Sequence, residues 1–189
     1  MKKDEVRKRI KAQKAVLNDR EKLLAADSVF SMLERTAAFL LSEKILMYHS
    51  LPDELPTHKF LEKWGTKKKF FLPRVNGLNL EILPYDKSTL SLGAFHIEEP
   101  VGNDTTDVRE IDLIIVPGVG YDASGNRVGR GKGYYDRLLA ESRALKIGVA
   151  YDFQVVENID CEPHDMKVDI IITDRHYYHV ASRRKTRFR

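Results

Sequence analysis

Cysteine is nearly absent from the chain: Cys161 is the single one among 189 residues. One thiol cannot form an internal disulfide, and it offers none of the spacing that structural metal sites use. Long apolar runs are also absent, since no stretch approaches the roughly twenty consecutive apolar residues of a membrane-spanning helix. The N-terminal MKKDEVRKRIKAQ lacks the apolar segment of a signal peptide. We therefore expect a cytoplasmic protein with no membrane partner.

Positive charge is in excess but unevenly placed. The formal net charge is +4, and much of the excess lies in RRKTRFR at 183–189. We expect this run to be a flexible, solvated tail, with a contact to RNA or an acidic partner as the alternative. The chain shows no interleaving of aromatic and basic residues and no known recognition helix. Nucleic acid is therefore not the partner that we expect.

The first third of the chain reads as helical. Two amphipathic helices are predicted, the second capped by Asp27 or Ser28. Their apolar residues are Val6, Ile10, Leu17 and Leu24 in the first helix, and Phe30, Leu33, Ala37 and Leu40 in the second. Thr57 is expected to cap a third helix, which carries Phe60, Leu61 and Trp64.

Apolar runs predict a sheet after this helical pair. Buried strands are expected at 45–48, 70–72, 113–116, 147–150 and 168–172, with Pro73 ending the second, and a helix is expected at 134–143. The alternation of Leu78, Leu80 and Ile82 favours a half-exposed strand that forms an edge hairpin with the segment before it. Strands that are apolar on both faces and separated by helices indicate the α/β class. We expect one domain, 1–189, with a mainly parallel sheet covered by helices on both faces.

One glycine-rich stretch is the strongest candidate site. DLIIVPGVGYDASGNRVGRGKGYYDRLL, at 112–139, passes from a buried strand through a glycine-rich loop into a helix. Ligands of open α/β sheets bind beyond the carboxyl ends of the strands, and glycine amides at a helix N-terminus attract anions. The glycines are Gly129, Gly131 and Gly133, and the cations are Arg127, Arg130 and Lys132. This combination predicts a polyphosphate site.

Two familiar nucleotide loops do not fit this stretch. A Walker motif requires Ser or Thr after Lys132, where the chain has Gly133, and a dinucleotide fingerprint requires a small residue where Tyr134 stands. Asp136 lies in the first turn of the predicted helix. It could hold a magnesium ion that bridges phosphates, or it could simply complement the helix dipole, and spacing does not decide between the two.

The stretch PGVGYDASGNRVGRGKGYYDRLL resembles the signature of the 5-formyltetrahydrofolate cyclo-ligases, also called methenyltetrahydrofolate synthetases. KDEVRKRI, YHSLPDELPT and HDMKVDIIIT follow the family's order, so the resemblance covers nearly the whole chain. It implies an ATP- and Mg²⁺-dependent enzyme that converts 5-formyltetrahydrofolate to 5,10-methenyltetrahydrofolate and releases ADP and phosphate. The formyl oxygen is phosphorylated first, and the anilino nitrogen then closes the ring. Such a phosphoryl transfer requires mainly positioning and charge neutralisation.

The resemblance also implies roles for individual residues. Arg130, Lys132 and Tyr134 are the expected catalytic residues, and Asp136 and Asp169 are the expected magnesium ligands. ATP is expected to contact Lys3, Arg7, Arg127, Val128, Gly129, Arg130, Gly131, Lys132, Gly133, Tyr134 and Tyr135. Folate is expected to contact His49, Glu54, Phe95, Arg130, Gly131, Lys132, Gly133 and Tyr134.

The folate side of the resemblance departs from the family at two points. Phe95 stands where many relatives have tryptophan, and Glu98 stands where proline is frequent. A related ATP-dependent enzyme with another formyl or amide substrate is therefore an alternative. A nucleic-acid-binding protein whose loop grips backbone phosphates is a second alternative. We expect the protein to be a monomer.

Overall fold

The protein, described here from a computed structural model over residues 1–92 and 98–180, is built around a seven-stranded sheet in the order β12-β11-β9-β6-β1-β2-β3. Its strands are β1 (Lys44–Leu46), β2 (Lys69–Asn76), β3 (Asn79–Pro84), β6 (Leu113–Val116), β9 (Leu145–Ala150), β11 (Ile170–Thr173) and β12 (Tyr177–His179). All pairings are parallel except β2 with β3 and β11 with β12, at the two edges. The expected α/β class with a mainly parallel sheet is confirmed.

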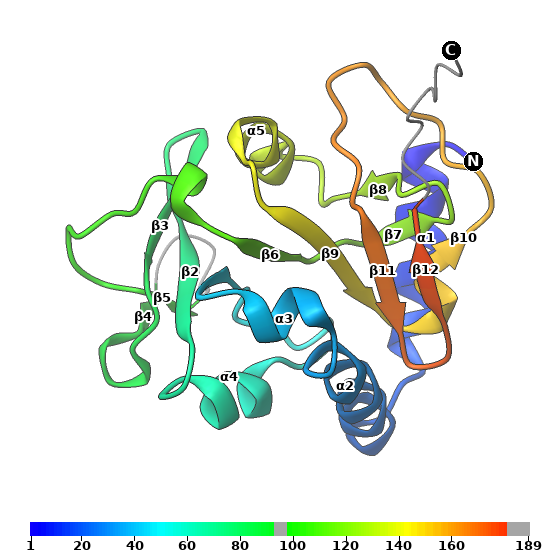
Figure 1. The fold of residues 1–189 in the computed structure, drawn as a ribbon. Coiled ribbons are helices and arrows are strands. Elements are labelled where there is room, and N and C mark those ends of the chain that lie inside the picture. The colour runs from blue at the N-terminus through cyan, green and yellow to red at the C-terminus, as the bar shows by residue number, and fades with distance from the viewer. Residues whose placement is uncertain (93–97, 181–189) are drawn as a thin grey trace, which may run out of the picture.

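Helices cover both faces of this sheet (Figure 1). The helices α2 (Asp19–Leu33), α3 (Ala37–Leu41) and α4 (His58–Trp64) pack on one face, and α5 (Tyr134–Glu141) packs on the other. Successive side chains of a strand point to opposite faces. Ile45 and Ile115 pack in the core under α2, α3 and α4, whereas Leu46 and Ile114 pack in the core under α5. Burial on both faces explains why these strands read as continuous apolar runs.

The N-terminal helices differ in their bounds from the prediction. The first helix, α1 (Lys3–Ala15), ends early, and α2 begins at Asp19, so Asp27 and Ser28 lie inside a helix. Asn18 is the actual cap: its Oδ1 accepts from the amide of Glu21 at 2.8 Å, and Glu21 Oε1 accepts from the amide of Asn18 at 3.3 Å. The sequence Asn-Asp-Arg-Glu is a capping box. It satisfies amide groups at the N-terminus of α2 and fixes where that helix starts.

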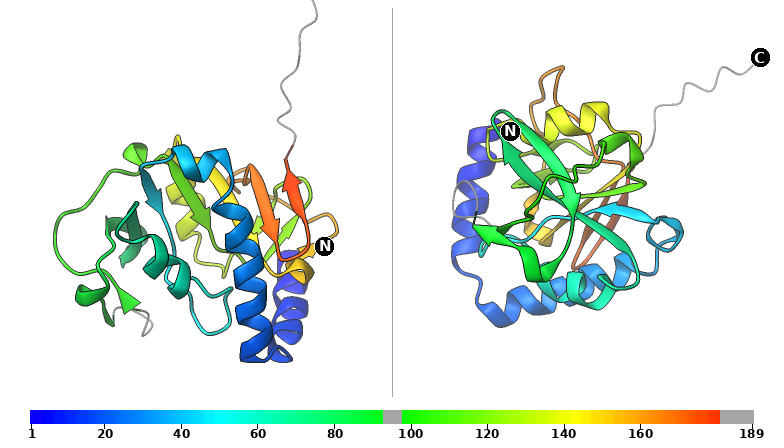
Figure 2. Two further views of the ribbon diagram at one scale, coloured as in Figure 1. Left: turned by 60° about the horizontal axis from the view of Figure 1, so that its bottom comes forward. Right: turned by 90° about the vertical axis from the view of Figure 1, so that its left-hand side faces the viewer.

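The predicted edge hairpin is confirmed, but Pro73 does not end its first strand. β2 pairs with β1 over Lys69–Phe71 and with β3 over Phe71–Asn76, so Pro73 lies opposite Ile82. Because β1 pairs with β2 only as far as Phe71, the missing amide hydrogen of Pro73 is tolerated as on an edge strand. The hairpin faces the viewer in the right-hand view of Figure 2.

Smaller elements complete the fold. A second sheet, in the order β10-β7-β8, consists of β7 (Gly120–Asp122), β8 (Arg127–Val128) and β10 (Val155–Val156). The short β4 (Ser91–Leu92) and β5 (Glu98–Glu99) form a two-stranded sheet, and the 3-10 turns are Lys87–Thr89, Val108–Glu110 and Asp152–Gln154. Val6 and Ile10 pack α1 against the second sheet through Val128 and Val156.

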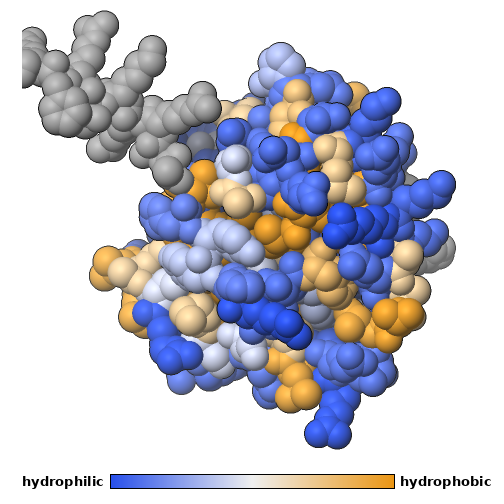
Figure 3. Space-filling view, turned by 90° about the vertical axis from the view of Figure 1, so that its right-hand side faces the viewer, coloured by the Kyte–Doolittle hydropathy of each residue, from blue (hydrophilic) through white to orange (hydrophobic). Residues whose placement is uncertain are grey.

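The surface is mainly hydrophilic on the face shown in Figure 3, where apolar residues form small separate groups. Among residues 1–92 and 98–180, no helix is both long and apolar enough to cross a bilayer. Phe95 and the 183–189 tail lie outside the described residues.

Candidate active site

The candidate site lies where the parallel strands end. The 47–57 segment follows β1, Pro117 and Gly118 follow β6, and Tyr151 follows β9. Because β1, β6 and β9 are neighbouring parallel strands, their carboxyl ends meet at one edge of the sheet. This edge is the position that the sequence predicts for the ligand.

The segment after β1 is held in one conformation by its own polar groups. Thr57 Oγ1 donates to the carbonyl of Tyr48 at 2.8 Å, and the Thr57 amide donates to Ser50 Oγ at 2.9 Å. Tyr48 donates its hydroxyl hydrogen to the carbonyl of Leu55 at 2.8 Å. Glu54 Oε1 accepts from the amide of Leu51 at 2.9 Å. The carboxylate of Glu54 is therefore oriented before any ligand binds.

The glycine loop runs from the end of β8 to the start of α5. Gly131 has φ +106°, and Gly133, which caps α5, has φ +71°. Both values are costly for residues with a side chain. A Cβ on Gly133 would also lie 2.7 Å from a guanidinium nitrogen of Arg137. Glycine at 133 therefore suits the left-handed turn, and a side chain there would displace the guanidinium of Arg137.

Arg137 ties this loop to the edge hairpin. Its Nη2 donates to the carbonyl of Lys132 at 3.0 Å, and its Nε donates to the carbonyl of Leu78 at 2.9 Å. Its guanidinium also lies 5.5 Å from the ring centre of Tyr134. The turn between β2 and β3 thus supports the loop from one side.

Helix α1 supports the loop from another side. Arg7 Nε donates to the carbonyl of Gly129 at 2.8 Å, and Arg7 Nη1 pairs with Asp4 at 2.8 Å. Lys3, one turn earlier on the same helix, pairs with Asp165 at 2.6 Å. Burial by itself lowers the pKa of Lys3, but the hydrogen bond to Asp165 and the surrounding carboxylates outweigh it and raise the pKa.

Arg127 and Val128 are the buried members of the predicted phosphate set. Arg127 donates from Nε to the carbonyl of Pro117 at 2.7 Å, and its guanidinium lies 5.1 Å from the ring centre of Tyr135. Val128 is fully buried, and its carbonyl accepts from the amide of Val119 at 2.8 Å. Burial is also the main cause that raises the pKa of the Tyr135 hydroxyl. In this arrangement Arg127 supports the base of the loop.

Arg130 connects the glycine loop to the segment after β1. Its Nη2 lies 2.9 Å from Asp53 Oδ1 and 3.8 Å from Glu54 Oε2. Burial acts to raise the pKa of Asp53, but the hydrogen bond and charge of Arg130 outweigh it and lower the pKa. Burial dominates at Glu54 and raises its pKa, because only 15% of that side chain is exposed. Two predicted site residues, 76 positions apart, are thus neighbours.

The remaining predicted catalytic residues lie on the outer side of the loop. Lys132 is exposed, and no carboxylate of the described residues pairs with its ammonium group. Tyr134 is half-buried, with its hydroxyl 3.5 Å from the carbonyl of Gly77. Lys132 is therefore available to an anion from solvent.

The two predicted magnesium ligands each have one oxygen in a backbone hydrogen bond. Asp136 Oδ1 accepts from the amide of Met166 at 3.1 Å, and Asp169 Oδ2 accepts from the amide of Lys146 at 2.9 Å. Asp136 thus contacts the segment that leads to Asp169. Within the described residues, no three His, Cys, Asp or Glu side chains cluster closely enough to hold a metal ion by themselves.

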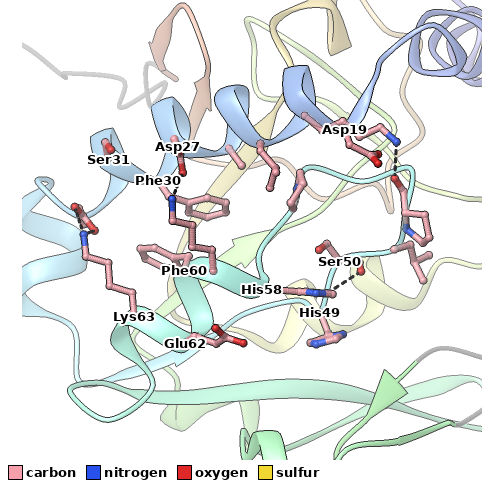
Figure 4. Close-up of a pocket in the computed structure, with 18 of the residues that line it drawn as sticks. Asp19, Asp27, Phe30, Ser31, His49, Ser50, His58, Phe60, Glu62 and Lys63 are labelled. Atoms are coloured by element: carbon pink, nitrogen blue, oxygen red, sulfur yellow. Dashed lines mark hydrogen bonds and ion pairs between the residues drawn. The ribbon is translucent and has the colours of Figure 1, made fainter.

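His49 lines a different hollow from Glu54. A groove of about 950 Å³ runs between α2 and α4, and His49 reaches it beside His58, with ring centres 4.0 Å apart (Figure 4). Its Nε2 lies 3.5 Å from Glu98, and burial lowers its pKa. Glu54 borders a much smaller cavity beside Lys14 and Gly118.

Sequence reasoning missed three residues of this region. Asp53 is adjacent to Glu54 in LPDELP, and Arg137 directly follows the predicted metal ligand Asp136, so the motifs themselves contained a signal for both. Lys14 had no such signal, since it is one of many charged residues on α1. Its position became visible only in the folded chain.

Comparison with known proteins identifies the same family that the sequence motifs resemble. The model of the 5-formyltetrahydrofolate cyclo-ligase family matches residues 1–174. A 5-formyltetrahydrofolate cyclo-ligase of Mus musculus is 30% identical over 188 residues, which cover 89% of each chain. That of Escherichia coli K12 is 30% identical over 144 residues, covering 71% of this chain and 79% of the relative. The NMR structure of Aquifex aeolicus 5,10-methenyltetrahydrofolate synthetase superimposes with a TM-score of 0.88 at 33% identity, covering 98% of this chain and 96% of the other.

Proposed function

Because the chain belongs to the 5-formyltetrahydrofolate cyclo-ligase family, we propose that it converts 5-formyltetrahydrofolate and ATP to 5,10-methenyltetrahydrofolate, ADP and phosphate at the edge where β1, β6 and β9 end. The formyl oxygen attacks the γ-phosphorus and ADP leaves. The anilino nitrogen then attacks the formyl carbon, loses its proton and expels phosphate. ADP and phosphate are the two leaving groups, the amine proton passes to solvent, and cleavage of the ATP phosphoanhydride bond supplies the driving force.

One observation supports this assignment above the others: Arg130 joins the two halves of the site. It belongs to the loop proposed to bind phosphates, and it lies 2.9 Å from Asp53 and 3.8 Å from Glu54 in the segment proposed to bind folate. A γ-phosphoryl group and a formyl oxygen must come within about 3.5 Å to react. A cation shared by both halves suits that requirement.

The phosphate side combines three kinds of donor. Loop amides from Gly129 to Gly133 and the N-terminus of α5 supply partial positive charge, and Lys132 supplies a full charge that no described carboxylate neutralises. Lys3 and Arg7 approach from α1, where Arg7 bonds the carbonyl of Gly129. In our proposal Lys132 and Arg130 stabilise charge that develops on the transferring phosphoryl group. Tyr134, at the start of α5, orients the reacting groups.

Magnesium fits this site through Asp136. A protein-bound Mg²⁺ commonly has one or two carboxylate ligands, with phosphate oxygens and water completing its shell. Asp136 has one oxygen outside its hydrogen bond to Met166, and the donor set needs no third carboxylate. A Mg²⁺ ion held by Asp136 would neutralise part of the negative charge of the phosphates. Asp169 stays a prediction from the family resemblance.

The folate side rests on Glu54. Its largely buried carboxylate, oriented by the amide of Leu51, accepts hydrogen bonds from the amino-pyrimidine edge of a pterin. His49 and Phe95 remain predicted contacts, and Phe95 lies outside the described residues. The cytoplasmic location and the monomeric state also remain predictions.

The direct test is an absorbance assay for methenyltetrahydrofolate. Protein, 5-formyltetrahydrofolate, Mg²⁺ and ATP are mixed, and an otherwise identical mixture lacks ATP. We expect an absorbance rise that requires ATP and releases one ADP per product. If no product forms with this substrate but ATP is hydrolysed with another formamide, the protein is instead an enzyme of the same fold that phosphorylates a different substrate.

A further inference from the structure

Lys14 is a lysine whose surroundings differ from those of its neighbours on α1. It lies in the last turn of the helix and is partly buried, whereas Lys8 and Lys11 are exposed. No hydrogen bond or ion pair joins its ammonium group to any of the residues described. Burial is the largest influence on it and lowers its pKa, against the opposing charges of Asp53 and Glu54. Partial burial of a cation without a hydrogen-bond acceptor is costly, which makes Lys14 a candidate for contact with a ligand.

The position of Lys14 identifies which ligand group it would meet. Lys14 and Glu54 both line a cavity of about 10 Å³ at the carboxyl edge of the sheet, together with Tyr48, Leu55, Pro117, Gly118, Val149 and Gln154. This volume holds about one water-sized group. The cavity therefore admits one polar group from the edge of a ring, while the ring and the rest of that edge stay outside it.

The chemistry of that edge matches the two charged groups. Glu54 as a carboxylate only accepts hydrogen bonds, and Lys14 as an ammonium only donates them. The pyrimidine edge of a pterin presents two donors, the 2-amino group and N3–H, beside one acceptor, the 4-oxo oxygen. A carboxylate and an ammonium that border one small cavity supply the complementary set.

We propose that Lys14 is a substrate-binding residue that donates a hydrogen bond to the 4-oxo oxygen of the pterin while Glu54 accepts from the 2-amino group and N3–H. This inference rests on the proposed function and deepens it, because it names the edge of the pterin ring that the site recognises. Arg130, which pairs with Asp53, keeps the role on the phosphate side that the proposed function gives it.

The test uses a ligand in which a 4-amino group, a hydrogen-bond donor, replaces the 4-oxo oxygen that Lys14 is proposed to contact. Binding of 5-formyltetrahydrofolate and of its 4-amino-4-deoxy counterpart is measured by calorimetry without ATP, for the wild type, Lys14→Met and Lys14→Arg. The exposed Lys11→Met on the same helix is the matched control. We expect Lys14→Met to weaken binding of the 4-oxo ligand by roughly 10- to 100-fold and to leave the 4-amino ligand within about 3-fold, since one charged hydrogen bond is lost with the first ligand alone. Lys14→Arg and Lys11→Met should keep the wild-type preference.

The outcomes separate this inference from the proposed function. Equal weakening of both ligands by Lys14→Met, or no weakening of either, overturns the role of Lys14 even if the wild type forms methenyltetrahydrofolate. A rise in KM for ATP alone would instead assign Lys14 to the phosphates and would also overturn it. A wild-type protein that neither binds nor converts 5-formyltetrahydrofolate refutes the proposed function itself.

Discussion

Arg130 Nη2 lies 2.9 Å from Oδ1 and 3.1 Å from Oδ2 of Asp53, so one nitrogen of the glycine loop bonds both oxygens of a residue that follows β1. Both side chains are about half exposed, at 50% and 51%. An exposed pair of this kind contributes little to stability, typically under about 1 kcal/mol. The pair therefore shows that the fold brings the glycine loop beside the segment after β1, and it contributes little to the stability of the fold.

Substitution of Arg130 is predicted to lower kcat/KM for ATP much more than substitution of Asp53. Arg130→Ala should lower kcat/KM for ATP by roughly 100-fold, because it removes a cation that stabilises the transferring phosphoryl group. Asp53→Asn should change it by less than about 5-fold, since only a weak surface ion pair is lost. Steady-state kinetics with varied ATP measures both. Comparable losses in the two variants would mean that the ion pair, not the phosphate, is the functional partner of Arg130.

Lys132→Ala is predicted to lower kcat by roughly 100-fold or more and to leave the fold intact. Lys132 is exposed and pairs with no described carboxylate, so its charge serves a ligand more than packing. Lys8→Ala, another exposed lysine, serves as the control and should keep wild-type turnover. Circular dichroism and the absorbance assay together check this prediction. Near-normal turnover of Lys132→Ala would remove it from the catalytic set.

Asp136→Asn is predicted to raise the Mg²⁺ concentration needed for half-maximal activity by about 10-fold or more, because it removes a carboxylate charge that favours the ion. Asparagine retains an oxygen that can accept from the Met166 amide, so the packing of the helix end should survive. Activity is measured against Mg²⁺ concentration at saturating ATP. An unchanged Mg²⁺ dependence would leave Asp136 as an acid that complements the N-terminus of α5.

Gly133→Ala is predicted to cost more stability than Gly77→Ala. Both glycines have positive φ, +71° and +62°, so each substitution carries a backbone cost of about 1–2 kcal/mol. A Cβ at 133 additionally meets Arg137 at 2.7 Å, whereas a Cβ at 77 meets nothing within 4 Å. Urea unfolding of the two variants measures the difference. If adding Arg137→Ala does not reduce the excess cost at 133, the steric explanation is wrong.

Because of the Lys3–Asp165 pair, the free energy of unfolding is predicted to fall as the solution becomes acidic. Asp165 is only 7% exposed. Burial acts to raise the pKa of its carboxyl, but the hydrogen bonds from the Glu162 amide and Lys3 outweigh this and lower it. A depressed carboxyl pKa stabilises the fold above the ordinary value of about 3.9, and this contribution is lost as the pH falls through the folded value. The raised pKa of Lys3 keeps its charge up to and beyond its ordinary value of 10.5.

The measurement compares the wild type with Asp165→Asn by urea unfolding from pH 6 to pH 2. Asparagine keeps an acceptor for the Glu162 amide, which bonds Asp165 at 2.8 Å, so mainly the charge is removed. We expect a difference of about 1–2 kcal/mol at pH 6 that shrinks toward zero near pH 2. A difference that stays constant over this range would exclude titration of Asp165 as its cause.

The helix boundaries and Pro73 show why local patterns missed some of the fold. The apolar spacing of Val6, Ile10 and Leu24 predicts one helix, but the capping box at Asn18 starts a second helix on which Leu24 is exposed. Pro73 continues β2 because β1 stops pairing at Phe71. Both outcomes depend on partners that lie elsewhere in the chain.

The sequence by itself determined the α/β class, the buried strands and the glycine loop, because apolar runs and glycine spacing are local consequences of burial and backbone freedom. Tertiary structure alone decided that Arg130 meets Asp53, that Arg127 is buried under Tyr135, and that Lys14 faces the cavity of Glu54. These contacts join segments that follow different strands. Their distances are set by the order β9-β6-β1 in the sheet, which no local pattern of residues contains.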